Sequence, residues 1–517
     1  MSGRIKPRLG GQDAPQPTTS RPKSPYWTLI TAFAGWKLFL FIIAAGSTII
    51  GDAYDTSGGL VVLGHENRNQ HHLHLGKRLI ARLTSWDAIY FVSVARRDYR
   101  FEQEWAFGSG LPLAIRAVLP FLALFGVGIT DHHHHGVGER LGDDDGAGRV
   151  PEALAGVLVA NAAHLLSVLV LYRLSQLIWP PADVRGDRDR TKSKSKLLLP
   201  LVAALLHIIS PAGVFLSAPY AESSCSLFSF AGYLFYAHSC LSSSAADANA
   251  YILLSGLAFG IATLFRSNAI LNGIPFAWEV FETLPRLFRR PAVAIPRLLA
   301  LGVGGVLVAL GSIVPQAVAY QRFCLSGTPS GGVGGGGGGD LLLPRPPAWC
   351  QGLLPSIYTF VQQHYWNTGF LRYWTVPNIP LFLLAAPMLA ILAKSGAEQL
   401  LPLLSPASAA PAGDRQLLNA ADQKRLPDPE AARRLSTLVR SAAAAQVLLA
   451  MLAVSTYHVQ IITRISSGYP LWYWWLADHL ITDGGESGSK SGSRVVVFMV
   501  LYASIQGVLF TSFLPPA

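Results

Sequence analysis

The sequence predicts an all-α protein that crosses a membrane many times. Of its 517 residues, 51% are hydrophobic and only 14% are charged, and the mean hydropathy is +0.35. Such a composition is too apolar for a soluble chain of this length. Uncharged apolar runs, each long enough to cross a hydrocarbon core as a helix, recur from Trp27 to Phe513. We therefore expect one membrane-embedded domain over 27–517, preceded by a basic cytosolic tail over 1–26.

About eleven segments are predicted to be membrane helices: 27–50, 111–129, 152–178, 197–215, 222–241, 250–275, 292–320, 377–393, 441–462, 469–480 and 495–514. A cytosolic N-terminus then places the long first loop, 51–110, and loop 321–376 in the lumen, and loop 394–440 in the cytosol. One loop conflicts with this scheme, because 179–196 is strongly basic yet falls on the luminal side. Segments 197–215 and 469–480 are alternatively half-helices that line a cavity.

The charge and the cysteines exclude several functions. The net charge of +11 lies mainly in connections between helices, which is typical of membrane topology signals, and nucleic-acid binding is not expected. No cysteine spacing suggests a metal site. Cys324 and Cys350 flank one polar loop and either form a disulfide, if that loop is luminal, or remain thiols. Three low-complexity insertions are expected at 130–150, 239–250 and 331–339, the first of which contains a run of four histidines that is better explained as a biased tract than as a metal site.

The end of the first polar loop alternates aromatic and acidic residues, from Trp86-Asp87 through Glu102 to Phe107. This pattern fits an amphipathic segment in the membrane interface. A functional interpretation is that Asp87 serves as a general base, because a sugar hydroxyl that attacks needs a positioned carboxylate. Glu102 is the second candidate for this role.

Several polar residues stand inside or beside the predicted helices. Arg266, within 250–275, needs a partner at membrane depth, and a lipid phosphate, an intramembrane ion pair or snorkelling to the interface would each provide one. His458, Gln460 and Arg464 stand at the predicted luminal end of another helix. They can contact the same lipid phosphate as Arg266. The other polar candidates are Glu222, Asn268, Trp366 and Asn367, which judged alone are more often structural than catalytic.

Six ordered motifs carry a resemblance to a known family. They are Trp86-Asp87, the run from Tyr99 to Phe107, the run from Ser210 to Ser223, Arg266-Ser267-Asn268, the run from Tyr365 to Tyr373, and the run from His458 to Arg464. Together they resemble the PIG-V class of mannosyltransferases, which act on the precursor of the glycosylphosphatidylinositol (GPI) anchor. One departure is Gly108-Ser109-Gly110-Leu111-Pro112, which lacks a phenylalanine and a proline that the family has there.

The resemblance implies a GT-C-type glycosyltransferase in the endoplasmic reticulum membrane with a luminal active site. It implies dolichyl-phosphate-mannose as donor, a mannosyl-glucosaminyl-phosphatidylinositol lipid as acceptor, and transfer of the second, α1,6-linked mannose with inversion. Asp87 would be the base and Glu102 would share or orient that role. Arg266 and Arg464 would stabilise the leaving phosphate, with His458 as helper. Substrate contacts are expected from Trp86, Glu222, Asn268, Trp366, Asn367 and Gln460. No metal is assigned, and a small accessory membrane subunit follows by family analogy only.

Two alternatives stay open at this point. The first is a lipid transporter or scaffold subunit, in which the buried charges line a pathway or hold a partner helix. A transporter often has matched repeats, and no internal repeat is evident in this sequence. The second is a related mannosyltransferase that acts on another step, against which only the motifs argue.

Overall fold

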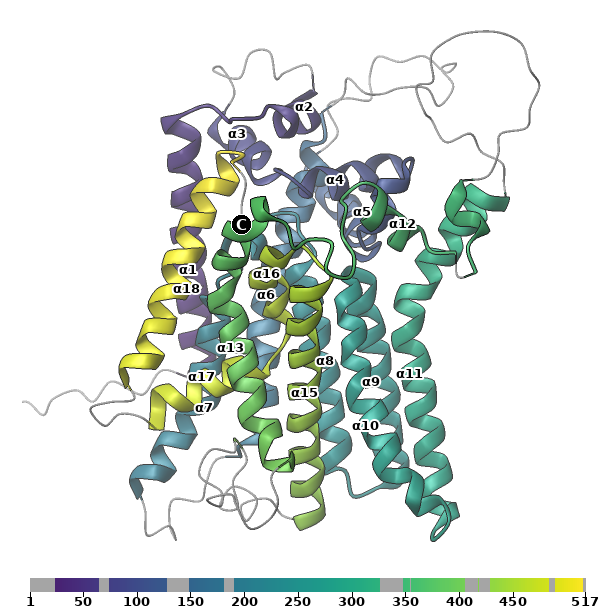
Figure 1. Cartoon of the computed structure of the whole chain (residues 1–517). Helices are drawn as coiled ribbons and strands as arrows, with labels where there is room; N and C mark the ends of the chain where they lie inside the picture. The colour runs from purple at the N-terminus through teal and green to yellow at the C-terminus, as the bar shows by residue number, and fades with distance from the viewer. Residues whose placement is uncertain are drawn as a thin grey trace, which may run out of the picture.

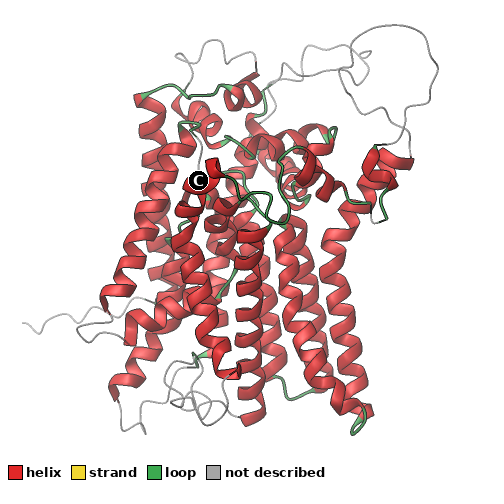
Figure 2. Cartoon of the chain, in the orientation of Figure 1, coloured by secondary structure: helices red, strands yellow, loops and turns green. Residues whose placement is uncertain are grey.

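The protein is a bundle of helices, with no strand among the described residues (Figure 2). The computed structural model describes residues 24–64, 74–127, 148–180, 190–325, 347–353, 355–404, 417, 428–482 and 489–514. In this part of the chain, seven helices are long and apolar enough to cross a membrane: Pro25–Ile50, Val150–Ile178, Ala245–Phe265, Pro291–Leu325, Val376–Leu401, Pro429–Ser455 and Ser491–Thr511. The expected all-α membrane protein is confirmed, whereas the expected number of eleven spans is not.

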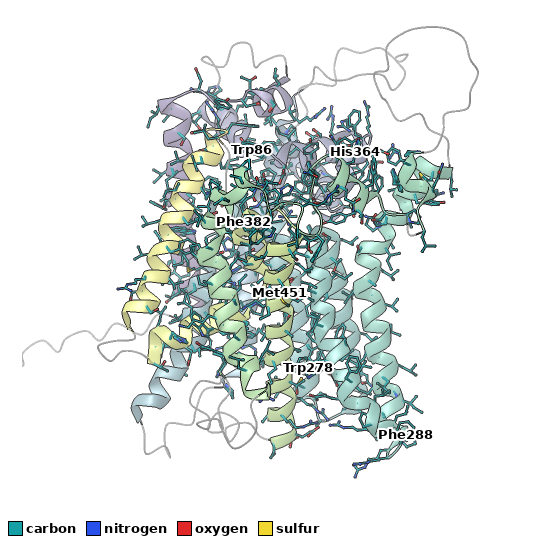
Figure 3. The ribbon with its side chains drawn as sticks, viewed as in Figure 1. Trp86, Trp278, Phe288, His364, Phe382 and Met451 are labelled. Carbon is teal, nitrogen blue, oxygen red and sulfur yellow. A yellow bond between two sulfur atoms is a disulfide. The ribbon has the colours of Figure 1, made fainter. Side chains whose placement is uncertain are left out.

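The long helices stand side by side and the short ones gather at one end (Figure 1). The long helices are α1 (Pro25–Ile50), α6 (Val150–Ile178), α7 (Arg190–Ile208), α8 (Glu222–Leu241), α9 (Ala245–Phe265), α11 (Pro291–Tyr320), α13 (Ile379–Leu404), α15 (Pro429–Ser455) and α18 (Ser489–Thr511). The helices at the top of Figure 1 are α2 (Ser57–Leu63), α3 (Leu75–Leu83), α4 (Ala88–Arg97), α5 (Gly110–Leu124) and α12 (Ile357–His364). We call this end of the bundle the loop end. Figure 3 shows Trp86 and His364 near it and Phe288 at the opposite end.

The segment predicted as a membrane helix at 111–129 does not cross the bundle. It forms α5, which lies beside α4 because the Arg116 guanidinium donates hydrogen bonds to the backbone carbonyls of Val94 and Ala95, each at 2.8 Å. Helix α6 also begins at the loop end, because Arg149, directly before it, donates a hydrogen bond to the Ser93 hydroxyl in α4. The described ends of α6 and α7 that flank the basic loop 179–196 therefore lie opposite the loop end, which removes the charge conflict.

The segment predicted as one helix over 250–275 is broken at Arg266. Helix α9 ends at Phe265, and Arg266 has an extended backbone with φ −144° and ψ 121°. The chain then turns back through the 3-10 helix η4 (Ser267–Gly273) into α10 (Ile274–Thr283). Pro275 stands in the first turn of α10, where its missing N–H costs no helical hydrogen bond. The prediction missed this return. The error compensates for the one at α5, so the described residues of loop 321–376 lie at the loop end.

Between α7 and α8 the chain forms a loop that is buried inside the bundle. The helix predicted over 197–215 ends at Ile208, and the described residues from Ser210 to Ala221, which include the 3-10 helix η3 (Gly213–Leu216), are all buried. This loop returns the chain to the loop end, where α8 begins at Glu222. The sequence-based count had placed Tyr220 to Ser223 on the cytosolic side, and the missed topology at α5 is the reason for that error.

Close packing and a few polar contacts hold the bundle together. Helices α9 and α11 approach so closely that a Cβ atom on Gly256 would lie 2.6 Å from Gly304 Cα. Toward the far end, Arg297 of α11 forms an ion pair with Glu279 of α10, with 2.6 Å between Nε and Oε1. At the loop end, Cys324 and Cys350 form a disulfide, which decides the alternative that the sequence left open.

Candidate active site

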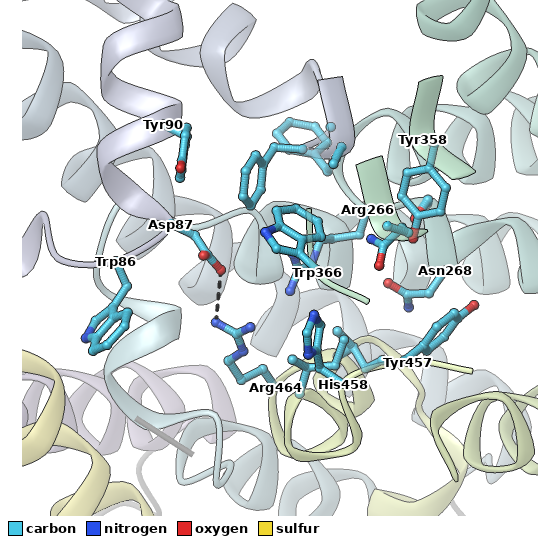
Figure 4. Close-up of a pocket in the computed structure, with 18 of the residues that line it drawn as sticks. Trp86, Asp87, Tyr90, Arg266, Asn268, Tyr358, Trp366, Tyr457, His458 and Arg464 are labelled. Atoms are coloured by element: carbon cyan, nitrogen blue, oxygen red, sulfur yellow. Dashed lines mark hydrogen bonds and ion pairs between the residues drawn. The ribbon is translucent and has the colours of Figure 1, made fainter. Parts of the chain in front are cut away.

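A cavity of about 500 Å³ opens at the loop end, where several helices begin or end. Its wall comes from the start of α4, from η4, from α12, from the 3-10 helix η9 (Val459–Ile461) and from the short helix α16 (Ile462–Ile465), which lies between α15 and α17 (Leu471–Thr482). Figure 4 shows the side chains that point into it. The ends of several helices meet at this cavity, and the chain forms irregular turns there because helix ends leave backbone groups unpaired. Side chains from distant parts of the sequence therefore line the same cavity.

Asp87 stands at the start of α4 and faces the cavity. The residue before it, Trp86, has a left-handed backbone with φ +59°, which is uncommon for a residue other than glycine. The Trp86 indole stacks on Phe513, with 5.0 Å between ring centroids, and this contact supports the sharp turn. The Asp87 side chain is one-third exposed, and its Oδ2 lies 3.5 Å from Arg464 Nη1 (Figure 4).

Arg266 reaches the cavity because α9 ends one residue earlier. Its Nη2 donates to Glu222 Oε1 at 2.5 Å, and Glu222 is the first residue of α8. Of the three partners that the sequence allowed, the structure contains the ion pair. The Nε atom of Arg266 is buried without a hydrogen-bond partner among the described residues.

Arg464 is the second cation of the cavity and lies between the two acids. Its guanidinium is 3.5 Å from Asp87 and 3.9 Å from Glu222. The rings of Phe215 and Tyr220 lie beneath it, with their centroids 4.6 and 5.6 Å from its Cζ. Two carboxylates and two guanidiniums thus form one formally neutral cluster, in which Glu222 is almost fully buried and Asp87 faces outward.

Aromatic and amide side chains form the rest of the cavity wall. Trp366 and His458 stand opposite Asp87 in Figure 4, with 6.2 Å between their ring centroids. Burial lowers the pKa of His458 below its usual value, so its imidazole is neutral at neutral pH and acts as a hydrogen-bonding group. A mostly apolar wall with a few convergent polar groups is typical of a small-molecule site.

Most of the residues singled out from the sequence meet in this cavity. Those that line it are Trp86, Asp87, Arg266, Asn268, Trp366, His458, Gln460 and Arg464. Glu222 lies behind them and holds both arginines. Glu102 does not line the cavity; its carboxylate accepts hydrogen bonds from Trp349 Nε1 at 2.9 Å and from the Tyr365 hydroxyl at 3.5 Å. Asn367 is exposed in a turn, with φ +49°, and also lies outside the cavity.

Sequence reasoning missed other residues of the wall. Tyr358 and Gln362 both line the cavity, and they lie four residues apart on the same face of α12. Tyr457 also lines it, and it directly precedes the motif that begins at His458. A search for polar residues at helical spacing in loop 321–376 would have found the first two. Phe513, at the opposite end of the sequence, carried no signal.

The described residues contain no group of three or more His, Cys, Asp or Glu side chains placed to hold a metal ion. The histidine run at 132–135 lies outside the described residues, as do most of the insertion at 130–150 and all of that at 331–339. The Ser/Ala stretch at 239–250 spans the end of α8 and the start of α9.

Comparison of the sequence with known proteins identifies related mannosyltransferases. The sequence model of the family described as Mannosyltransferase (PIG-V) matches residues 41–127 and 152–517, and so leaves out the whole insertion at 130–150. The chain is 56% identical to GPI mannosyltransferase 2 of Chaetomium globosum over 95% of this chain and 96% of that protein. It is 40% identical to the protein of that name from Gibberella zeae, over 95% and 98% of the two chains.

The similarity to solved structures is much weaker. An oligosaccharyltransferase of Archaeoglobus fulgidus in its apo form superimposes with a TM-score of 0.40 at 12% identity, over 93% of this chain and 56% of that one. The chain thus spans about half the length of that protein, and at this level neither fold details nor activity transfer. The family match and the helical bundle support the all-α polytopic membrane protein that the sequence predicts. The chain belongs to the PIG-V family of mannosyltransferases.

Proposed function

We propose that this protein transfers the second, α1,6-linked mannose of the GPI anchor from dolichyl-phosphate-mannose onto a mannosyl-glucosaminyl-phosphatidylinositol lipid. The family and the names of its relatives support a mannosyltransferase of GPI assembly. The observation that carries the proposal is the cavity itself, in which an outward-facing carboxylate stands beside two guanidiniums at one end of a membrane bundle. These are the charges that a sugar transfer from a lipid phosphate requires.

The proposed reaction is a single displacement at the anomeric carbon. Asp87 accepts the proton of the acceptor's 6-hydroxyl as its oxygen forms the new bond to that carbon. The bond from the anomeric carbon to the phosphate oxygen breaks on the opposite face, and the phosphate leaves with the electron pair. Attack from the face opposite the leaving group inverts a β-linked donor to an α-linked product.

Arg266 and Arg464 are proposed to stabilise the leaving phosphate. Guanidinium groups match phosphate oxygens with paired donors, and both side chains line the cavity. Because Arg464 contacts Asp87, a phosphate that binds Arg464 competes with Asp87 for the guanidinium and releases the carboxylate toward the acceptor. The neutral His458 imidazole and the Asn268 and Gln460 amides are suited to hydrogen-bond the sugar hydroxyls.

The loop end is proposed to face the lumen of the endoplasmic reticulum. Disulfides persist in oxidising compartments, and the disulfide between Cys324 and Cys350 lies at this end. Membrane lipids surround the helices in this arrangement. Two expectations from the resemblance, a small accessory membrane subunit and a share of Glu102 in the base role, remain predictions, and the place of Glu102 outside the cavity does not favour the second.

The test of this proposal is the lipid that accumulates in cells without the protein. We expect the GPI precursor with one mannose to build up, and wild-type protein to restore the two-mannose lipid. Accumulation of a precursor with no mannose or with two would assign the protein to another step. Unchanged precursors would contradict a role in GPI mannosylation altogether.

A further inference from the structure

The bundle contains a buried lysine that the cavity does not use directly. Lys37 lies near the middle of α1 and is only 5% exposed. No ion pair between Lys37 and a carboxylate occurs among the described residues. Its Nζ instead donates to the backbone carbonyl of Leu216 at 2.8 Å and to Ser217 Oγ at 2.7 Å. An ionisable side chain at this depth in a membrane helix is costly and needs a reason.

Both acceptors belong to the buried loop between α7 and α8. A loop at membrane depth must satisfy its backbone polar groups inside the protein, because lipid offers no hydrogen bonds. The turn at Leu216 and Ser217 receives donors from three helices. Lys37 of α1 donates to both residues, Ser223 of α8 donates to Leu216 O at 3.1 Å, and Asn161 of α6 donates to Ser217 O at 3.1 Å. Lys37 is the only ionisable side chain among these donors.

This loop supports the two charged groups proposed to act in the reaction. Phe215, next to the Lys37 acceptors, lies under the Arg464 guanidinium. Tyr220 also contacts Arg464, and its hydroxyl donates to the backbone carbonyl of Ser85 at 3.3 Å, two residues before Asp87. The Phe215 and Tyr220 rings themselves meet edge to face, with centroids 5.1 Å apart. The loop that Lys37 binds therefore contacts Arg464 through Phe215 and Tyr220, and it contacts the turn before Asp87 through the Tyr220 hydroxyl.

We propose that Lys37 is a positioning residue for mannose transfer: it fixes the buried loop from Ser210 to Ala221, and the loop sets the relative placement of Asp87 and Arg464. Lys37 touches neither substrate. The inference rests on the proposed function, and it assigns to the first membrane helix a role beyond anchoring. Rate depends steeply on such placement, since a misalignment of about 1 Å can cost about a hundredfold.

The test compares Lys37→Met and Lys37→Arg in the full-length protein reconstituted in lipid, with transfer measured per folded molecule. Methionine keeps the length of the side chain and removes its donors and charge, whereas arginine keeps both. We expect kcat of Lys37→Met to fall at least about tenfold. The KM values for donor and acceptor should stay within about twofold, and Lys37→Arg should recover most of the rate. Thr48→Val is the matched control, because Thr48 is buried in the same helix but donates only to Ala44 of that helix; it should transfer like wild type.

A wild-type kcat per folded Lys37→Met molecule would overturn the inference, as would a loss that arginine does not restore. If Lys37→Met fails to accumulate, Ser217→Ala decides the question, because it removes one of the two acceptors of Lys37 and leaves the charge in place. It should lower kcat severalfold without a change in KM, and an unchanged kcat would again overturn the inference. An inactive wild-type protein in the same assay would instead contradict the proposed function.

Discussion

The two acids of the cluster have the same chemistry but different surroundings. Glu222 is 1% exposed and pairs with both guanidiniums, whereas Asp87 is one-third exposed, faces the cavity and pairs with Arg464 at 3.5 Å. Environment assigns such paired carboxylates to different tasks. Asp87 is therefore placed to meet a substrate, and Glu222 is placed to hold the arginines.

We predict that Glu222→Gln weakens both the fold and the use of donor. The amide cannot balance two cations, and loss of one charged partner from a buried ion pair typically costs about 3 kcal/mol. Thermal unfolding of the purified protein should show a lower midpoint, and the KM for dolichyl-phosphate-mannose should rise. Arg96 and Glu152 provide a matched pair outside the cavity, so Glu152→Gln should lower the midpoint without changing the donor KM. An unchanged donor KM in Glu222→Gln would contradict the role given to it.

At the scale of residues, the sequence was informative where a motif combined a charge with an apolar context. Asp87, Arg266 and Arg464 were found in this way, and the structure brings them together. Residues such as Tyr358 and Phe513 were not found, because an aromatic side chain in a membrane protein is ordinary. Only the path of the chain reveals that they face the same space.

At the scale of elements, the site depends on how helices end. Arg266 enters the cavity because α9 stops at Phe265, and Asp87 does so because α4 starts after the turn at Trp86. Hydropathy does not detect such ends, since apolar residues continue on both sides. The helix over 250–275 was therefore predicted as continuous, although α9 ends at Phe265.

The contact between the 3-10 helix η2 (Glu102–Ala106) and the 3-10 helix η7 (Ala348–Gln351) gives a second prediction. Glu102 accepts the Trp349 indole N–H, and Trp349 precedes the disulfide residue Cys350. We expect Glu102→Ala to lower stability by about 1–2 kcal/mol and to leave kcat within about threefold. Trp349→Phe removes the same hydrogen bond from the other side, so the stability effects of the two changes should not add. Loss of transfer in a folded Glu102→Ala protein would contradict this prediction and would support a role of Glu102 in catalysis.

At the scale of the whole molecule, the direction in which each segment runs through the bundle is the feature that the sequence predicted least well. Helix α5 is apolar enough to resemble a span but lies at the loop end, and the return through η4 and α10 was missed. Each error reverses the predicted direction of every later helix. The two errors therefore cancel after α10, and only the helices between α5 and α10 were predicted in the wrong direction. The charge conflict at 179–196 was a sign in the sequence that the direction of the crossings was wrong there.

This topology predicts where engineered glycosylation sites will be used. An N-glycosylation sequon inserted beside Leu353, which is almost fully exposed at the loop end, should be glycosylated in cells. A sequon inserted between Trp179 and Arg190 should not be, because the described ends of α6 and α7 on either side lie opposite the loop end. Glycosylation at the second position and not at the first would reverse the proposed orientation of the site.

The most direct test of the central claim is mannose transfer by Asp87→Asn, measured with dolichyl-phosphate-mannose and the one-mannose acceptor. Asp98→Asn is the matched control: Asp98 directly follows the same helix and pairs with Arg116 and Arg322 outside the cavity, and asparagine keeps the shape of its side chain. We predict a fall in kcat of at least about a hundredfold for Asp87→Asn, with normal abundance and membrane insertion, and near wild-type transfer for Asp98→Asn. Transfer by Asp87→Asn at a rate close to wild type would contradict the account.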